Sequence, residues 1–444
     1  MTNNEKTKIQ IYKNICTNFN YKLYNKEKRI TLEKTKNFKS NFIWNILGTG
    51  LNAVNSLFFM ICVTRINGTT NAGIFTIAFS TACVLYVIGV YAGRVYQVTD
   101  RKGNITDNDY IFNRLISCVL MIIIALAFVI IRKYDIYKTT IFMLLAFYKC
   151  IEAFSDVIYG VLQKKDFLNI VGKSYFFKSL VSIIAFIVTD YITKQMIFSC
   201  IAIIVIWLIF LLFYDIKYAK KIVDFKLKIN LKNVNSIFKN GFFIFAITFF
   251  SIYITNAQKY AIDRFLTEDI QAIFGIIIMP ATVMALFSQF LMHPYLTTIS
   301  KLCDKGQTKE LNKLIFKIVL SLFGLGLVAT LLAYFIGIPV LELLYGISLK
   351  GYEISLAVII IAATLYNVGI IYSSVLTTIR KTFIQFIIYL IVSAMSLFTA
   401  NFMTKANGIY GAVTSYFISM AIFFILYIII DKIEMNKLKK QFEK

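Results

Sequence analysis

The sequence predicts an all-α membrane protein with about twelve transmembrane helices in two bundles of six. Two observations predict this class: 58% of the 444 residues are hydrophobic and only 16% are charged, with a mean hydropathy of +0.71. Soluble domains are nearer half apolar and a quarter charged. Twelve spans of about 20 residues would occupy roughly 240 residues. The composition therefore excludes a water-soluble enzyme of this size.

Apolar runs of span length recur along the chain, six before a basic segment and six after it. They cover 42–64, 74–94, 111–131, 139–162, 174–189, 195–214, 241–262, 270–293, 314–338, 354–378, 383–402 and 409–430. These runs predict a basic cytoplasmic tail at 1–41, a first bundle at 42–214, a basic linker at 215–240, a second bundle at 241–430 and a cytoplasmic tail at 431–444.

The distribution of positive charge predicts the orientation of the spans. The formal net charge is +24, and 34 of the 47 Lys and Arg residues fall in segments expected inside, against 8 in those expected outside. Cytoplasmic loops carry the excess of basic residues in membrane proteins. Both termini and the linker are therefore expected in the cytoplasm. Orientation and attraction to anionic lipid explain the basic composition, and no nucleic-acid partner is expected.

The two halves contain a weak internal repeat. At an offset of 199 residues, Arg65 matches Arg264 and Ile74-Phe75 matches Ile273-Phe274. At an offset of 203 residues, Lys102-Gly103 matches Lys305-Gly306, and Arg114 matches Lys317 at the foot of the third span of each half. Halves of six spans that both begin inside are parallel repeats, related by a pseudo-two-fold axis along the membrane normal. Transporters are often built this way, with the substrate path between the halves.

Ionisable residues within the spans are the candidate functional groups, because charge in a membrane interior is costly. Lys149, Glu152 and Asp156 share one face of the fourth span. Lys149 either pairs with Glu152 or faces a wet cavity, and three ionisable groups on one face favour the cavity.

The same three-then-four spacing recurs in the seventh span at Asn256, Lys259 and Asp263. Lys259 and Asp263 could form an i,i+4 ion pair, or Asp263 could lie among lipid headgroups. Arg94 and Lys178 are close enough to the inner interface to snorkel, which is the alternative to a place in a cavity.

Motifs of soluble enzymes and metal sites are not convincing in this chain. The 7 Cys form no C-x-x-C pair and there is 1 His, so we expect no metal site. Asp107-Asn108-Asp109 matches the D-x-D metal motif of nucleotide-sugar transferases, but the short loop 95–110 leaves no room for a nucleotide domain. We expect no catalytic residue and no cofactor.

Three sequence features resemble the polysaccharide-exporter flippases, the O-antigen type within the multidrug/oligosaccharidyl-lipid/polysaccharide superfamily. They are Arg65 at the end of the first span, Tyr91-Ala92-Gly93-Arg94 at the end of the second, and Gly408-Ile409-Tyr410-Gly411-Ala412 at the start of the twelfth. The resemblance covers about residues 38–430. It implies a twelve-helix, two-bundle protein of the bacterial plasma membrane that moves undecaprenyl-pyrophosphate-linked oligosaccharides from the inner to the outer leaflet by alternating access.

The resemblance also implies a cationic lumen. It places Lys149, Lys178, Lys259 and Arg94 there by position and charge. Because the chain has no nucleotide site, an ion gradient or the substrate gradient must supply the energy. The candidate carriers of a proton or a sodium ion are Glu152, Asp156 and Asp263.

The implied partners are the lipid-linked substrate, membrane lipids and the polysaccharide polymerase and chain-length machinery. Two alternatives remain. A multidrug antiporter would share the fold but would more naturally use an acidic cavity for cationic drugs. A membrane glycan polymerase or ligase usually has a large outer loop, whereas the longest outer connection here is 339–353.

The topology is testable with single cysteines in a cysteine-free background. An impermeant thiol reagent should label Asn407→Cys in intact cells, because this position is expected outside. Asn235→Cys should react only after permeabilisation. Labelling at position 235 but not at 407 in intact cells would contradict the predicted orientation.

Overall fold

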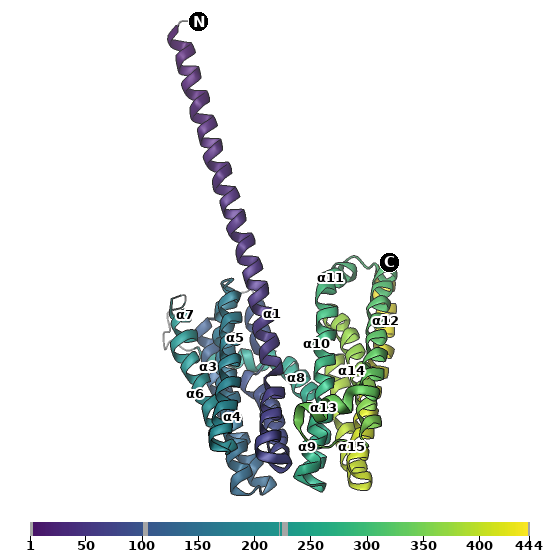
Figure 1. Cartoon of the computed structure of the whole chain (residues 1–444). Coiled ribbons are helices and arrows are strands. Elements are labelled where there is room, and N and C mark those ends of the chain that lie inside the picture. Colours follow the sequence, from purple (N-terminus) through teal and green to yellow (C-terminus); the bar gives the residue numbers. More distant parts are fainter. Residues whose placement is uncertain (1–2, 101–104, 222, 224–229, 443–444) are drawn as a thin grey trace.

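The chain is all-helical, as predicted, wherever its structure is described. The computed structural model describes residues 3–100, 105–221, 223 and 230–442, with side chains from residue 40 onward except that of His293. The tail side chains and Lys102-Gly103 of the repeat lie outside the described residues. No strand occurs in the described ranges. The helices form two lobes, with both chain ends on one side of the molecule (Figure 1).

The first lobe holds the helices of the first half of the chain. They are α1 (Asn3–Val90), α2 (Gly93–Thr99), α3 (Asp107–Arg132), α4 (Ile136–Lys164), α5 (Leu168–Thr193), α6 (Met196–Phe210), the π-helix η1 (Leu211–Asp215) and α7 (Ile216–Lys220). The N-terminal part of α1 projects beyond the lobe (Figure 1). The fifth span is longer than its apolar run, since α5 begins six residues before 174.

The second lobe holds the remaining helices. They are α8 (Leu231–Phe265), α9 (Glu268–Ile277), α10 (Met279–Met292), the 3-10 helix η2 (His293–Tyr295), α11 (Leu296–Asp304), α12 (Thr308–Leu332), the π-helix η3 (Ala333–Gly337), α13 (Ile338–Tyr345), α14 (Glu353–Thr378) and α15 (Thr382–Phe442). Residues 216–220 and 231–240, expected in the linker, are helical and extend the neighbouring spans.

Twelve membrane crossings follow from these helices. Nine helical stretches in the described chain are long and apolar enough to cross a membrane. Two of them, 40–99 and 382–442, are broken by Gly68 at φ 83° and Gly408 at φ 58° into two spans each. Glycine adopts this left-handed backbone at little steric cost. The charged α4, long enough at 29 residues, makes the twelfth crossing. The chain is a multi-pass membrane protein.

We call the end with the two chain termini the inner end and the opposite end the outer end, following the charge-based prediction. Each lobe has its own apolar core, and the core of the first lobe continues at the outer end onto Ala272 and Ile276 of α9 and Tyr345 of α13. The lobes are therefore packed together at the outer end. At the inner end, the ribbons of α1 and α10 stand apart (Figure 1).

Within the first lobe, α1 and α5 approach closely through glycines. A side chain on Gly48 would collide with the backbone of Gly172, and one on Gly172 would collide with the backbone at Trp44. Small residues let helix backbones approach in membranes, where dispersion and polar contacts replace the hydrophobic effect. Gly50, two residues away, has open space around it.

This packing predicts opposite effects for two neighbouring alanine substitutions. Gly48→Ala should lower the unfolding temperature of the detergent-solubilised protein, since overpacking costs about 1–3 kcal/mol. Gly50→Ala is the matched control, and it should leave the unfolding temperature unchanged or raise it because alanine favours the helix. Equal unfolding temperatures for the two variants would contradict the close packing of α1 on α5.

Candidate functional site

The charged face of α4 forms the centre of the candidate site. Lys149 Nζ lies 2.6 Å from Glu152 Oε2, and Asn52 of α1 donates to Glu152 Oε1 at 3.1 Å. The Lys149 ammonium also lies over the rings of Phe79 and Tyr86, 4.9 and 5.7 Å from their centroids. Cation–π contact and ion pairing both stabilise a desolvated ammonium. The ion pair between Lys149 and Glu152 is thus confirmed, while the place of Lys149 in a cavity, which the sequence favours, stays a prediction.

One turn closer to the inner end, Asp156 is held by two arginines. Arg114 of α3 donates to Asp156 at 3.2 Å and to the carbonyl of Gly89 at 3.3 Å. Arg94 Nε lies 3.7 Å from Asp156. Arg114 is buried, whereas the Arg94 side chain is 23% exposed. Arg94 therefore pairs within the lobe and still reaches open space, instead of simply snorkelling to the interface.

A sharp turn between α1 and α2 places Arg94 there. Tyr91, Ala92 and Gly93 all have positive φ, at 28°, 33° and 67°. Left-handed backbone is costly for residues with a side chain, so neighbouring contacts must hold the turn. Tyr91 stacks on Phe245 of α8 and donates its hydroxyl to the Phe238 carbonyl at 2.8 Å. The motif in the sequence is thus a contact between the lobes as well as a turn.

A cavity of about 270 Å³ lies between the lobes in their inner half. Tyr86, Arg94 and Asp156 line it from the first lobe, and Phe245 and Thr248 of α8 line it from the second. The charged side chains of Arg94 and Asp156 on one wall thus face the Phe245 ring and the Thr248 side chain on the other. Such a surface can hold a polar group that carries charge.

Lys259 lies on the other side of the boundary between the lobes. Its ammonium donates to Ser80 Oγ of α1 at 2.8 Å, next to the Phe79 ring that Lys149 contacts. Lys259 also lines a second cavity of about 240 Å³ in the second lobe. Lys259 does not form the i,i+4 ion pair with Asp263 that the sequence left open as one alternative, because Asp263 is bound by other residues.

Asp263 belongs to an ion-pair cluster at the outer end of the lobes. Arg132 and Lys138, which flank the connection from α3 to α4, both pair with Asp263, and the Tyr134 hydroxyl donates to it at 2.8 Å. Lys138 also pairs with Glu268. Asp263 therefore joins the lobes and does not lie among lipid headgroups. Arg65 adds another link by donating to the carbonyls of Leu343 and Leu344.

Lys178 lies elsewhere, fully buried inside the first lobe. Its ammonium pairs with Asp215 at 2.5 Å and donates to Ser155 and Tyr159, each at 2.9 Å. Ser174 donates to the same carboxylate at 2.6 Å. All three ammonium hydrogens thus have partners. Lys178 neither snorkels nor lines the cavity between the lobes, which corrects the expectation from the sequence.

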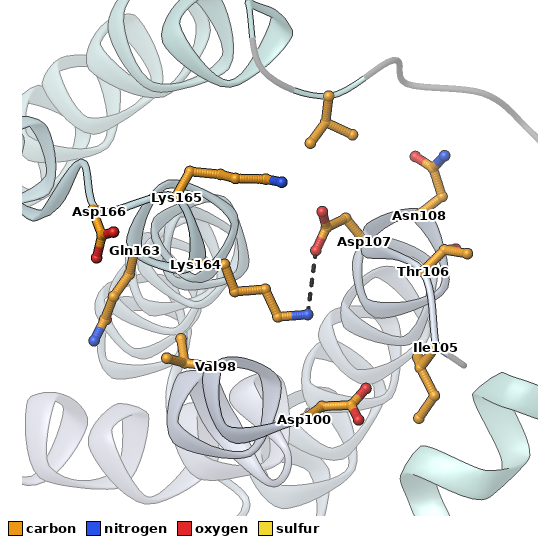
Figure 2. A pocket seen from close by; sticks show the side chains of 11 residues that line it. Val98, Asp100, Ile105, Thr106, Asp107, Asn108, Gln163, Lys164, Lys165 and Asp166 are labelled. Carbon is orange, nitrogen blue, oxygen red and sulfur yellow. Dashed lines mark ion pairs between the residues drawn. The ribbon is translucent and has the colours of Figure 1, made fainter. Parts of the chain in front are cut away.

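The D-x-D motif begins α3 at the inner surface. Asp109 forms a capping box with Thr106 and accepts from Asn233 at 2.8 Å, so it fixes the start of α3 against α8. Asp107 and Lys164, 3.6 Å apart, lie in a surface pocket of about 680 Å³ (Figure 2). No group of three or more metal-ligating side chains occurs among the residues that the structure describes. The motif therefore serves as a helix cap.

Two residues of the charge network are not among the site residues that the sequence predicts. Arg114 stands out in the sequence only as a repeat position at the foot of the third span, and a basic residue at that place in an apolar helix is the signal that points to it. The sequence places Asp215 in the linker, although it ends η1, which continues the apolar helix α6, and there it pairs with the buried Lys178. A carboxylate directly after an apolar run can belong to the span.

The fold has clear counterparts among known structures. Lipid II flippase MurJ in an inward closed conformation aligns with a TM-score of 0.66 and 15% identity, covering 90% of each chain. An inward-facing multidrug resistance MATE family transporter of the MOP superfamily aligns with a TM-score of 0.61 and 13% identity, covering 90% of this chain and 94% of that one.

The chain has the fold of the MOP-superfamily transporters. Its sequence is 23% identical over 318 residues to that of the capsular polysaccharide biosynthesis protein CapF of Staphylococcus aureus. The aligned region covers 70% of this chain and 77% of CapF. No family model matches the chain. The MOP fold agrees with the two lobes and with the resemblance found in the sequence.

The Lys178–Asp215 pair gives a test of its structural role in this MOP fold. Lys178→Met should strongly lower the unfolding temperature, because breaking a buried pair costs about 3–5 kcal/mol. The double variant Lys178→Met/Asp215→Leu should recover much of the loss, since no unpaired charge remains. A double variant less stable than Lys178→Met would contradict the assignment of the pair.

Proposed function

We propose that this protein is a flippase that moves undecaprenyl-pyrophosphate-linked oligosaccharides from the inner to the outer leaflet for surface polysaccharide synthesis. The observation that carries the proposal is the charge balance where the lobes meet. Inward of the ion pairs around Asp263, the network on and beside the charged face of α4 has four cations, Lys149, Arg94, Arg114 and Lys259, and two carboxylates, Glu152 and Asp156. The formal balance is two positive charges, which favours an anionic substrate.

A flippase needs such a balance because its substrate carries a pyrophosphate through the membrane. Losing bulk water is costly for a charged group unless opposite charge and hydrogen bonds replace it. As the substrate enters from the inner end, Arg94 can donate two parallel hydrogen bonds to its phosphate oxygens. The glycan would occupy the space between the lobes at the inner end. The lipid tail stays in the bilayer beside the opening.

The packing of the lobes supports an inward-open resting state. The ion pairs around Asp263 and the contacts of Arg65 hold the outer end closed. The cavity beside Arg94 lies in the inner half, toward the leaflet where the substrate is made. Transport then requires the outer contacts to break while the inner half closes, which is alternating access.

We keep the three carboxylates predicted from the sequence as candidates for ion coupling. Glu152, Asp156 and Asp263 all pair with cations, so proton or sodium binding at any of them would release a basic partner. We propose that release of Arg94 or Lys149 by such binding exposes positive charge to the substrate. The two termini and the linker face the cytoplasm in this scheme, in a bacterial plasma membrane.

Deletion of the gene should trap the substrate on the inner leaflet. A flippase makes and breaks no covalent bond, so completed lipid-linked repeat units should accumulate inside while surface polysaccharide is lost. Leaflet-specific labelling of the lipid-linked glycan in a strain without a second flippase measures this. Complementation with the wild type should restore outer-leaflet glycan, and Lys149→Glu, present in the membrane at the same level, should not.

Other outcomes would identify the alternatives. Normal levels of outward-facing intermediates would contradict the flippase proposal. Single repeat units outside the cell would indicate a polymerase, and intact surface glycan with new sensitivity to cationic dyes would indicate a multidrug antiporter.

A further inference from the structure

The four cations that the sequence predicts within the spans differ in whether a carboxylate pairs with them. Lys149 pairs with Glu152, Arg94 with Asp156, and Lys178 with Asp215. Lys259 has no carboxylate at ion-pair distance among the residues whose side chains are described. Its ammonium donates a hydrogen bond to the neutral hydroxyl of Ser80 at 2.8 Å. An ammonium can donate three hydrogen bonds, so Lys259 retains both charge and donors for a ligand.

The cavity beside Lys259 has the chemistry of a polar binding pocket. Thr255, Asn256, Asn367, Tyr366 and Tyr416 line it together with small apolar side chains. The Asn256 and Asn367 amides each donate to a carbonyl one turn earlier, at 2.9 and 2.8 Å, which fixes their orientation. Ligand sites typically combine an apolar wall with a few oriented polar groups.

The size of the cavity limits what can occupy it. Its volume of about 240 Å³ corresponds to about eight water molecules at ~30 Å³ each. That space suits a diphosphate or a single sugar ring, but not an oligosaccharide. Because Lys259 is the charged group on its wall, the anionic part of a ligand fits best.

Ser80, the present partner of Lys259, ends a stripe of small residues on α1 that faces the second lobe. Thr69, Gly73, Thr76 and Ser80 are spaced four, three and four residues apart, so they share one helix face. Thr69 donates to Asp269, Gly73 lies against the Glu268 backbone, and Thr76 packs on Gly275. The Lys259–Ser80 bond is thus the innermost contact of the stripe that joins the lobes.

We propose that Lys259 binds the diphosphate of the lipid-linked substrate in the second-lobe pocket, and that the diphosphate replaces Ser80 as the partner of the ammonium. This inference rests on the proposed flippase function. A charge-assisted bond to phosphate is about twice as strong as a bond to a neutral hydroxyl. Substrate binding therefore breaks the innermost contact of the α1 stripe. The loss of this contact weakens the packing that holds the two lobes together at the outer end.

The experiment measures equilibrium binding of radiolabelled farnesyl diphosphate, with farnesol as the uncharged control, to the full-length protein in neutral-lipid nanodiscs. Lys259→Gln should weaken diphosphate binding about tenfold or more, because a hydrogen bond to a charged group is lost. Lys259→Arg should retain most of the binding. Ser80→Ala should tighten it about threefold or more, since the competing acceptor is gone. Lys405→Gln, an exposed lysine of the same lobe, is the matched control and should bind like wild type.

The outcomes separate this inference from the proposed function. Equal affinity of wild type and Lys259→Gln for farnesyl diphosphate, with both preferring it over farnesol, overturns the pocket and leaves the flippase proposal standing. A weaker Lys259→Gln with an unchanged Ser80→Ala supports the pocket and overturns the competition with Ser80. A wild type that does not prefer the diphosphate over farnesol overturns the inference, and the leaflet-labelling experiment then decides whether the flippase proposal also fails.

Discussion

The cost of burying charge in a membrane is the constraint on which the arrangement of this molecule depends. An isolated charge in the hydrocarbon region is so unfavourable that it must find a partner, water or a ligand. The first lobe meets this requirement internally. Glu152, Asp156 and Asp215 each bind at least one cation from another turn or another helix. The pair of Asp156 with Arg114 fixes how α4 faces α3, and the pair of Asp215 with Lys178 fixes how η1 faces α5.

The boundary between the lobes follows a different principle. Its outer half combines close backbone contact through Gly73 with polar links at Asp263 and Arg65. Its inner half is more open and holds the cavity lined by Arg94 and Asp156. Apolar packing and ion pairs thus close one end, while charge gathers where the lobes separate. That separation leaves charged side chains at a cavity between the lobes without exposing the core of either lobe.

Much of the fold was predictable because the membrane imposes a simple pattern on the sequence. Apolar runs of span length located the helices, and the spacing of Lys149, Glu152 and Asp156 placed them correctly on one face. The partners of Lys178 and Asp263 were not predictable, since Asp215 and Lys138 are distant in sequence. The i,i+4 spacing of Lys259 and Asp263 was misleading, because helices of the other lobe compete for both side chains. Ion pairs within one turn can be predicted from spacing, whereas pairs between helices require the packing.

The closed outer end also determines how the molecule can move. The part of α1 between residue 40 and the break at Gly68 spans about 42 Å at ~1.5 Å per residue, which makes it a lever that pivots at its outer end. If the lobes rotate by about 10° around the outer contacts, the far end of such a lever swings by roughly 7 Å. Sub-ångström changes beside the pivot are thereby amplified into an opening or closing of the inner entrance. In the proposed mechanism, the glycan at the inner end and the diphosphate beside Lys259 belong to one substrate, so both act on the same rotation.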